Sequence, residues 1–160
     1  MTHPTDQSWQ SLPNSARWLG LTGLIPFFAA AVAMLIPPPE IPLSIIIGAQ
    51  VLYGAVILSF LGGVAWGAAM ARGERDLLPY ALAVAPSLVA WFALILINPF
   101  RQAFVLALAF GLLWLVDRYH TKVGRYPQPF FQLRTLLTIG VVASLLTSGF
   151  ALLSYLPPSP

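Results

Sequence analysis

The chain has 160 residues, of which 58% are hydrophobic and only 8% are charged, and its formal net charge is +3. Soluble domains carry roughly 25% charged residues, so eight basic and five acidic residues are too few to cover a soluble globule and suffice only if most of the surface faces lipid. The absence of cysteine excludes disulfides, thiolate metal sites and cysteine nucleophiles, and with only two histidines we expect no metal site.

The chain begins with a polar segment, residues 1–16, which we expect to form a cytoplasmic tail. This segment lacks the basic start and the small-residue cleavage site of a signal peptide. The first apolar stretch, residues 18–36, follows and ends at three consecutive prolines, through which no helix continues. Pro26 lies inside it, and its missing N–H predicts a kink.

Four further stretches approach the length of about 20 apolar residues that a helix needs to cross a bilayer core of about 30 Å. They cover residues 43–70, 77–97, 100–117 and 135–156, and a short tail, 157–160, follows. The fourth span is the shortest, because only 15 uncharged residues separate Arg101 from Asp117, or about 22 Å of helix. Either these two side chains extend from the ends of a short crossing helix, or the segment dips into the membrane and returns.

The basic residues favour a crossing, because loops on the cytoplasmic side of a membrane carry an excess of lysine and arginine. With five crossings, the N-terminal tail and the loops after the second and fourth spans share one side. Seven of the eight basic residues then lie on that side, and Arg101 alone lies on the other. The seven are Arg17, Arg72, Arg75, Arg118, Lys122, Arg125 and Arg134.

The predicted fold class is therefore all-α: a polytopic membrane protein with a bundle of five transmembrane helices in one domain, residues 17–156. Its N-terminus lies inside and its C-terminus outside. This topology accounts for the basic net charge, and no basic and aromatic residues interleave along an exposed face, so we expect no nucleic-acid partner.

Small residues in the second span predict which helix faces meet. Helices in lipid gain little from hydrophobicity, so close packing of small side chains decides their contacts. Ala55, Ser59, Gly63 and Gly67 recur every four residues, and Gly62 widens this face. We expect the second span to be the central helix, packed by the other spans or by its copy in a homodimer.

The same span carries a resemblance to a known family. The run from Tyr53 to Gly67, above all its block Ser59-Phe60-Leu61-Gly62-Gly63-x-x-Trp66-Gly67, is similar to the membrane family called domain of unknown function 3429, which includes eukaryotic transmembrane protein 69. Looser matches are residues 20–26 and 85–91, and Asp117 followed by residues 129–130 and 134–138. The resemblance covers about residues 16–153. It implies a small protein of the bacterial inner membrane or of an organelle, and it implies no activity.

A first candidate site lies where the fourth span ends, since ionisable residues at membrane depth are costly. Asp117 is followed by Arg118, His120 and Lys122, and Arg134 opens the fifth span on the same side. One interpretation is an Asp117–Arg134 pair that ties the two helix ends together. The other is a polar patch in which Arg118, Lys122 and Arg134 contact a lipid headgroup or another anion, while His120 relays protons near neutral pH.

A second candidate site lies within the second span. Gln50, Tyr53, Ser59 and Trp66 would form a crevice lined by aromatic and amide groups, suited to a flat apolar ring such as a quinone. Hydrogen bonding between helices explains Gln50 and Ser59 equally well and is the preferred interpretation.

Neither candidate site supplies the nucleophile, base and orienting group of a hydrolase, so we predict no catalytic residues. The first hypothesis is a non-enzymatic protein of the bacterial inner membrane, either an accessory or assembly subunit or a binder of a lipid or quinone. No other cofactor is expected, and the partners are membrane lipid and either a second copy or a membrane complex. A small transporter or channel, and an intramembrane enzyme that acts on a lipid or quinone through Asp117 and His120, are the alternatives.

Overall fold

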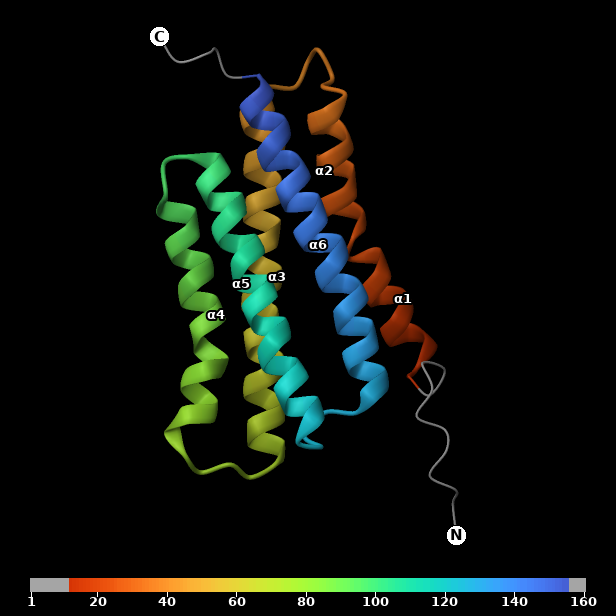
Figure 1. Cartoon of the computed structure of the whole chain (residues 1–160), viewed down its shortest axis with the longest axis vertical. Helices are drawn as coiled ribbons and strands as arrows, with labels where there is room; N and C mark the ends of the chain where they lie inside the picture. The colour runs from red at the N-terminus through yellow and green to blue at the C-terminus, as the bar shows by residue number, and fades with distance from the viewer. Residues whose placement is uncertain (1–11, 156–160) are drawn as a thin grey trace.

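The computed structural model describes residues 12–155, which form six α helices (Figure 1). The terminal segments 1–11 and 156–160, which include most of the two predicted tails, lie outside the described residues. The helices are α1 (Asn14–Thr22), α2 (Ile25–Leu35), α3 (Leu43–Ala71), α4 (Leu77–Ile95), α5 (Pro99–Lys122) and α6 (Gln128–Ser154).

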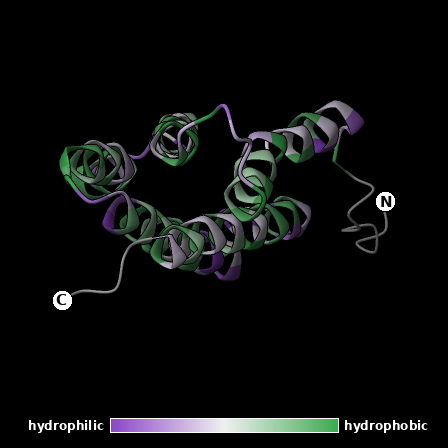
Figure 2. Ribbon diagram, turned by 90° about the horizontal axis from the view of Figure 1, so that it is seen from above, coloured by the Kyte–Doolittle hydropathy of each residue, from purple (hydrophilic) through white to green (hydrophobic). Residues whose placement is uncertain are grey.

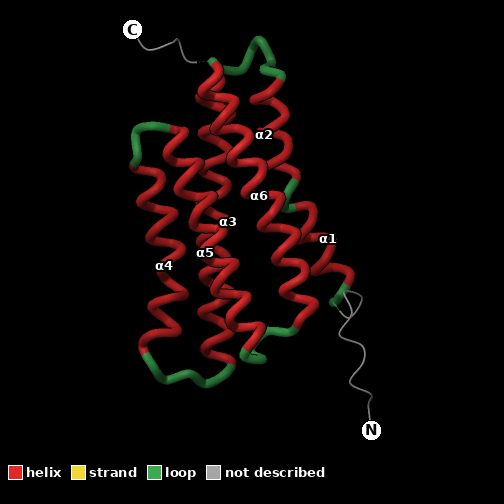
Figure 3. The backbone as a smooth tube through the Cα atoms, viewed as in Figure 1, coloured by secondary structure: helices red, strands yellow, loops and turns green. Residues whose placement is uncertain are grey.

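These helices supply five segments that are long and apolar enough to cross a membrane, with α1 and α2 together forming the first. The all-helical fold and the membrane class expected from the sequence are thus confirmed. The connections alternate between the two ends of the bundle, as Figure 3 shows. The start of α1 and the loops α3–α4 and α5–α6 lie at one end, which we call the basic end, and the loops α2–α3 and α4–α5 lie at the other.

The first span is interrupted at Gly23 and Leu24, where the sequence predicted a kink. Pro26 occupies the second position of α2, where its missing N–H breaks no helical hydrogen bond. A break inside a membrane exposes backbone carbonyl groups, which need partners from neighbouring helices. The Tyr53 hydroxyl of α3 donates to the Gly23 carbonyl over 3.1 Å and so meets this need.

The fourth span is a continuous helix and longer than predicted. Asn98 caps it by accepting from the N–H groups of Phe100 and Arg101, and Pro99 follows as its first residue. The helix continues beyond Asp117 to Lys122, so its 24 residues measure about 36 Å. Likewise α6 begins at Gln128 rather than at residue 135. Both predicted bounds stopped at a charge, and the structure buries those charges as a pair, so the helices pass through them.

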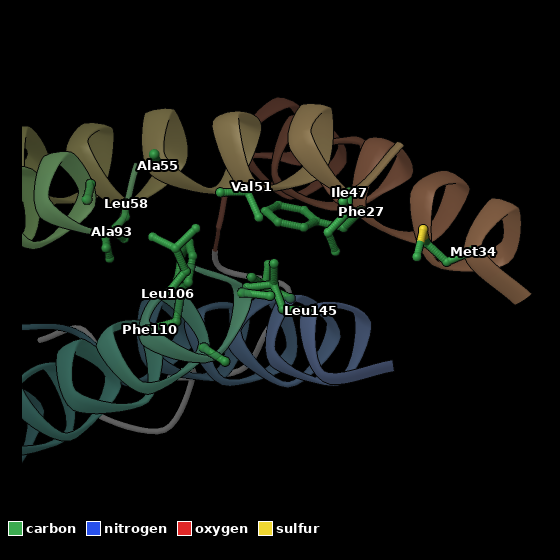
Figure 4. Packing of buried hydrophobic residues seen from close by; sticks show 14 of the residues in the cluster. Phe27, Met34, Ile47, Val51, Ala55, Leu58, Ala93, Leu106, Phe110 and Leu145 are labelled. Atoms are coloured by element: carbon green, nitrogen blue, oxygen red, sulfur yellow. The ribbon is translucent and has the colours of Figure 1, made fainter. Parts of the chain in front are cut away.

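The core lies where α2, α3, α5 and α6 meet (Figure 4). Helix α3 packs against α2, α4, α5 and α6, which makes it the central helix, as expected. Phe27 inserts between the helices and meets the ring of Phe110 edge-on, with 6.4 Å between the ring centroids. The largest fully buried apolar side chains are Phe27, Phe110, Met34, Ile47, Leu58, Leu106, Leu145 and Val51.

The outer surface of the bundle is apolar as well. Large hydrophobic side chains such as Phe60, Leu88 and Ile139 are each at least 60% exposed. In the view along the bundle, hydrophobic residues also cover outward sides of the helices (Figure 2). Such a surface fits lipid and not water.

The packing face of α3 includes only part of the predicted set, because Gly62 belongs to it and Gly63 and Gly67 do not. A Cβ atom added at Gly62 would lie 2.5 Å from the Ala83 carbonyl oxygen of α4, so only glycine allows this approach. At Gly63 and Gly67 an added Cβ would meet nothing within 4 Å. Ala55 is buried as predicted. Gly63 and Gly67, which form a GxxxG pair, therefore make no helix contact within the described residues. Neighbouring residues on a helix point about 100° apart, so Gly63 faces away from α4 while Gly62 faces it. The use of the GxxxG pair in a homodimer stays a prediction.

Candidate functional site

Two identical helix ends build the polar cluster at the basic end. After α3, the Gly73 N–H donates to the Met70 carbonyl and the Glu74 N–H to the Ala69 carbonyl. After α5, the same Schellman pattern joins Gly124 to Thr121 and Arg125 to His120. Both glycines have positive φ, 68° and 74°, which the motif requires.

The two caps place Glu74 and Arg125 at equivalent positions beyond neighbouring helices. A guanidinium nitrogen of Arg125 lies 3.7 Å from Glu74 Oε1, and Arg72 Nε lies 3.5 Å from the same oxygen. The Glu74 backbone carbonyl also accepts from the Tyr80 hydroxyl over 2.8 Å. Glu74 is therefore shared between two arginines, and it ties the α3–α4 loop to α4 and to the α5–α6 loop.

Asp117 and Arg134 form a buried ion pair between α5 and α6. Arg134 Nε donates to Asp117 Oδ2 over 2.7 Å, and the side chains are only 6% and 8% exposed. The predicted tie between the two helix ends is thus present. Arg134 faces its partner inside the protein, so this geometry does not present it to a lipid headgroup.

His120 lies between aromatic rings next to this pair. Its ring centroid is 5.2 Å from that of Tyr126 and 5.9 Å from that of Tyr119. His120 Nδ1 is buried and has no hydrogen-bond partner among the described residues. Tyr126, in the loop between α5 and α6, has its pKa raised above the ordinary value of 10 by burial and by the negative charge of Asp117, so its hydroxyl stays neutral near pH 7.

A groove between α4 and α5 leads to this cluster. Its apolar part has a volume of about 330 Å³ and is lined from both helices, with Pro86 and Val89 on α4 and Ala109 and Leu112 on α5. A second hollow of about 470 Å³ continues it toward the basic end, and both share Leu82 and Val116 as lining residues. The polar residues that line this second part are Glu74, Asp76, Tyr119, His120 and Arg125.

The two other predicted anion contacts lie on a different side of α5. Arg118 and Lys122 are exposed, and the Arg118 guanidinium lies 5.6 Å from the centroid of the Trp114 ring. Trp114 lines a separate apolar hollow between α5 and α6 and donates to Thr135 Oγ1 over 2.9 Å. Of the five residues of the first candidate site, only His120 lines the polar end of the α4–α5 groove.

The residues of the second candidate site are divided among separate contacts. Gln50 is 2% exposed and donates from Nε2 to the Phe27 carbonyl over 3.1 Å and to Ser144 Oγ over 2.9 Å. It therefore links α3 to α2 and α6, as the preferred interpretation held. Ser59 instead donates to the Ala55 carbonyl of its own helix.

Trp66 lies apart from Gln50 and Tyr53, about four helical turns further along α3. Its indole N–H points to the Met70 sulfur at 3.1 Å, and its ring packs edge-on against Tyr80 of α4. The structure does not bring Gln50, Tyr53 and Trp66 into one crevice. Binding of a ligand at these three residues stays a prediction.

Glu74, Asp76 and Tyr126 were not among the predicted site residues, and Arg125 entered only as a loop charge. The one signal for them was the glycine just after each helix, at 73 and 124, which is typical of a Schellman cap. Two equal caps on helices that end at the same side bring the following residues together only if those helices are neighbours. The sequence did not predict that adjacency.

Comparisons with known proteins agree with the resemblance seen in the sequence. Residues 12–150 match the model of the family described as protein of unknown function (DUF3429). Transmembrane protein 69 of Xenopus tropicalis is 38% identical over 142 residues, which are 85% of this chain and 54% of that protein. Its Mus musculus counterpart is 32% identical over 130 residues, 79% of this chain and 52% of that protein. The chain thus spans about half the length of these relatives, and no solved structure matches it.

Proposed function

We propose that this chain, which belongs to the DUF3429 family of proteins of unknown function, is a non-catalytic protein that holds one amphiphilic molecule. The molecule is a lipid or a quinone, and it lies between α4 and α5. The observation that carries this proposal is the continuity of the groove. An apolar hollow suited to a hydrocarbon chain joins a polar hollow suited to a headgroup at Leu82 and Val116.

Two further features support binding at this place. Leu82, Leu108 and Leu112 are each about half exposed, so a molecule in the surrounding lipid reaches the groove without passing through the core. Asp117, the carboxylate that an intramembrane enzyme would need as its base, is held by Arg134, which favours binding over catalysis. The proposal includes a location in the bacterial inner membrane with the basic end in the cytoplasm.

The test is native mass spectrometry of protein purified in mild detergent. We expect one defined amphiphile at a near-stoichiometric amount. Ala109→Phe and Leu112→Trp, which fill the groove, should each reduce its occupancy at least fivefold. Val56→Trp places an equally large side chain on the exposed face of α3, away from the groove, and serves as the control. The same mixed lipids in all four proteins would contradict the proposal.

A further inference from the structure

Two exposed cations lie close together near the end of α5. Arg118 and Lys122 are four residues apart, so they share one face of the helix. Among the residues that the structure describes, neither of them forms an ion pair. Two like charges at this spacing repel each other, and an anion placed between them would relieve the repulsion.

The acidic side chains described at this end of the bundle are engaged elsewhere. Asp117, the neighbour of Arg118 in the chain, forms its ion pair inside the bundle. Glu74 and Asp76 line the polar hollow between α4 and α5, to which neither Arg118 nor Lys122 contributes. Within the described residues, these two cations are therefore available to a negatively charged molecule at the membrane surface.

The apolar hollow between α5 and α6 lies one helical turn before these cations. It has a volume of about 480 Å³ and is lined by Gly111 and Trp114 of α5 and by residues of α6 that include Ile139, Val142 and Ala143. The missing side chain at Gly111 helps to keep it open, since a Cβ atom added there would meet nothing within 4 Å. Walls of this kind suit a hydrocarbon chain.

Trp114 joins the hollow to the cations. Its indole N–H donates to Thr135 Oγ1 over 2.9 Å, and its ring stacks on Phe131 with 5.7 Å between the ring centroids, so its position is fixed. The Arg118 guanidinium lies 5.6 Å from the centroid of this ring. Arg118 and Lys122 follow Trp114 by about 6 and 12 Å along the helix axis. A hollow for a hydrocarbon chain thus leads directly to two positive charges.

We propose that α5 and α6 bind an anionic phospholipid, with one acyl chain in the hollow beside Gly111 and Trp114 and the phosphate at Arg118 and Lys122. This site shares no lining residue with the α4–α5 groove and goes beyond the proposed function. Basic residues near a membrane surface attract anionic headgroups, and the planar guanidinium offers a phosphate two parallel hydrogen bonds. A phosphatidylcholine headgroup also carries a cation, which the two positive charges repel.

The test is a titration of the delipidated full chain in detergent with dioleoyl-phosphatidylglycerol or dioleoyl-phosphatidylcholine, followed by native mass spectrometry. We expect phosphatidylglycerol to bind more tightly. Arg118→Gln and Lys122→Gln should each weaken its binding about fivefold and leave phosphatidylcholine unaffected. Arg75→Gln removes an exposed charge from the α3–α4 loop at the same end of the bundle and is the matched control.

Two further variants separate this site from the α4–α5 groove. Ala143→Trp fills the hollow from an exposed position of α6 and should weaken phosphatidylglycerol binding at least fivefold. The losses caused by Arg118→Gln and Lys122→Gln should persist in a Leu112→Trp background, in which the α4–α5 groove is closed. The result therefore does not depend on the proposed function.

Three results would overturn the inference. The first is equal affinity of the unaltered chain for the two lipids. The second is a loss for Arg118→Gln and Lys122→Gln no larger than for Arg75→Gln, which would show attraction to the basic end as a whole. The third is phosphatidylglycerol binding that Leu112→Trp removes and Ala143→Trp leaves intact. That outcome would place the lipid in the α4–α5 groove and support the proposed function alone.

Discussion

At the scale of single residues, the Asp117–Arg134 pair explains how two charges lie within helices that cross a membrane. Each charge alone would be costly in a medium of low dielectric constant, and each compensates the other at 2.7 Å. The pair therefore lets α5 and α6 continue past the positions where hydropathy alone would end them. It also leaves His120, one turn further on, as the polar group of this region with an unused nitrogen.

We expect each single replacement of this pair, Asp117→Leu or Arg134→Met, to lower the free energy of unfolding by about 3–5 kcal/mol, because it leaves an uncompensated buried charge. The double variant should lose much less than the sum of the two, since no charge remains unpaired. Unfolding in detergent, followed by circular dichroism, measures all three. Strictly additive losses would show that the two side chains act independently.

At the scale of helices, the contact between α3 and α4 depends on one glycine. Gly62 brings the α3 backbone against Ala83 and Pro86, and no side chain fits between them. The neighbouring Gly63, which belongs to the GxxxG pair, faces away from this contact. Close approach in membranes relies on such small residues, but which of them is used depends on the side that the partner occupies.

Gly62→Ala should therefore lower the free energy of unfolding by about 1–3 kcal/mol, because the added methyl group forces α3 and α4 apart or strains them. Gly63→Ala is the matched control and should be neutral or slightly stabilising, since alanine favours the helix and the position is open. Thermal unfolding in one detergent compares the two.

Gly63→Leu tests whether the face that carries Gly63 and Gly67 packs against a second copy of the chain. We expect it to disrupt assembly and not folding, because the position is open within one chain and a leucine there blocks the close approach of a second helix. A fall in oligomeric state with unchanged Tm would identify the GxxxG face as a contact between copies, whereas a Tm loss as large as that of Gly62→Ala would contradict the packing described above.

At the scale of the whole molecule, the two ends of the bundle differ in charge. The α3–α4 and α5–α6 loops and the start of α1 meet at the basic end, near seven of the eight basic residues. Arg101, at the start of α5, belongs to the opposite end. The bias of lysine and arginine toward cytoplasmic loops is the basis for proposing that the basic end faces the cytoplasm.

This orientation is testable by labelling, because the chain contains no cysteine. Single variants Glu40→Cys, in the α2–α3 loop, and Gln128→Cys, at the start of α6, place one thiol at each end and remove no basic residue. In intact cells a membrane-impermeant maleimide should label Glu40→Cys, and it should label Gln128→Cys only after permeabilisation. The reverse pattern would show the opposite orientation.

What the sequence determined by itself is local along the chain. Five apolar stretches, the prolines near residues 26 and 37–39, and the distribution of arginines specify five membrane helices and a break in the first. These properties depend on the length and composition of each segment, which determine whether a helix can span the bilayer and in which orientation. The Asp117–Arg134 pair could also be predicted from the sequence, since both residues lie at ends of predicted spans on the same side.

The tertiary structure alone decided which faces meet. A change of one residue turns a helix by about 100°, so the choice between Gly62 and Gly63 depends on where α4 lies and not on the spacing of glycines. The meeting of Glu74 with Arg125, and the groove that ends at His120, require α3, α4 and α5 to be neighbours. Adjacency is a property of the packed bundle, because helices in lipid are sorted by the fit of their side chains and not by hydrophobicity, which is the same on every face.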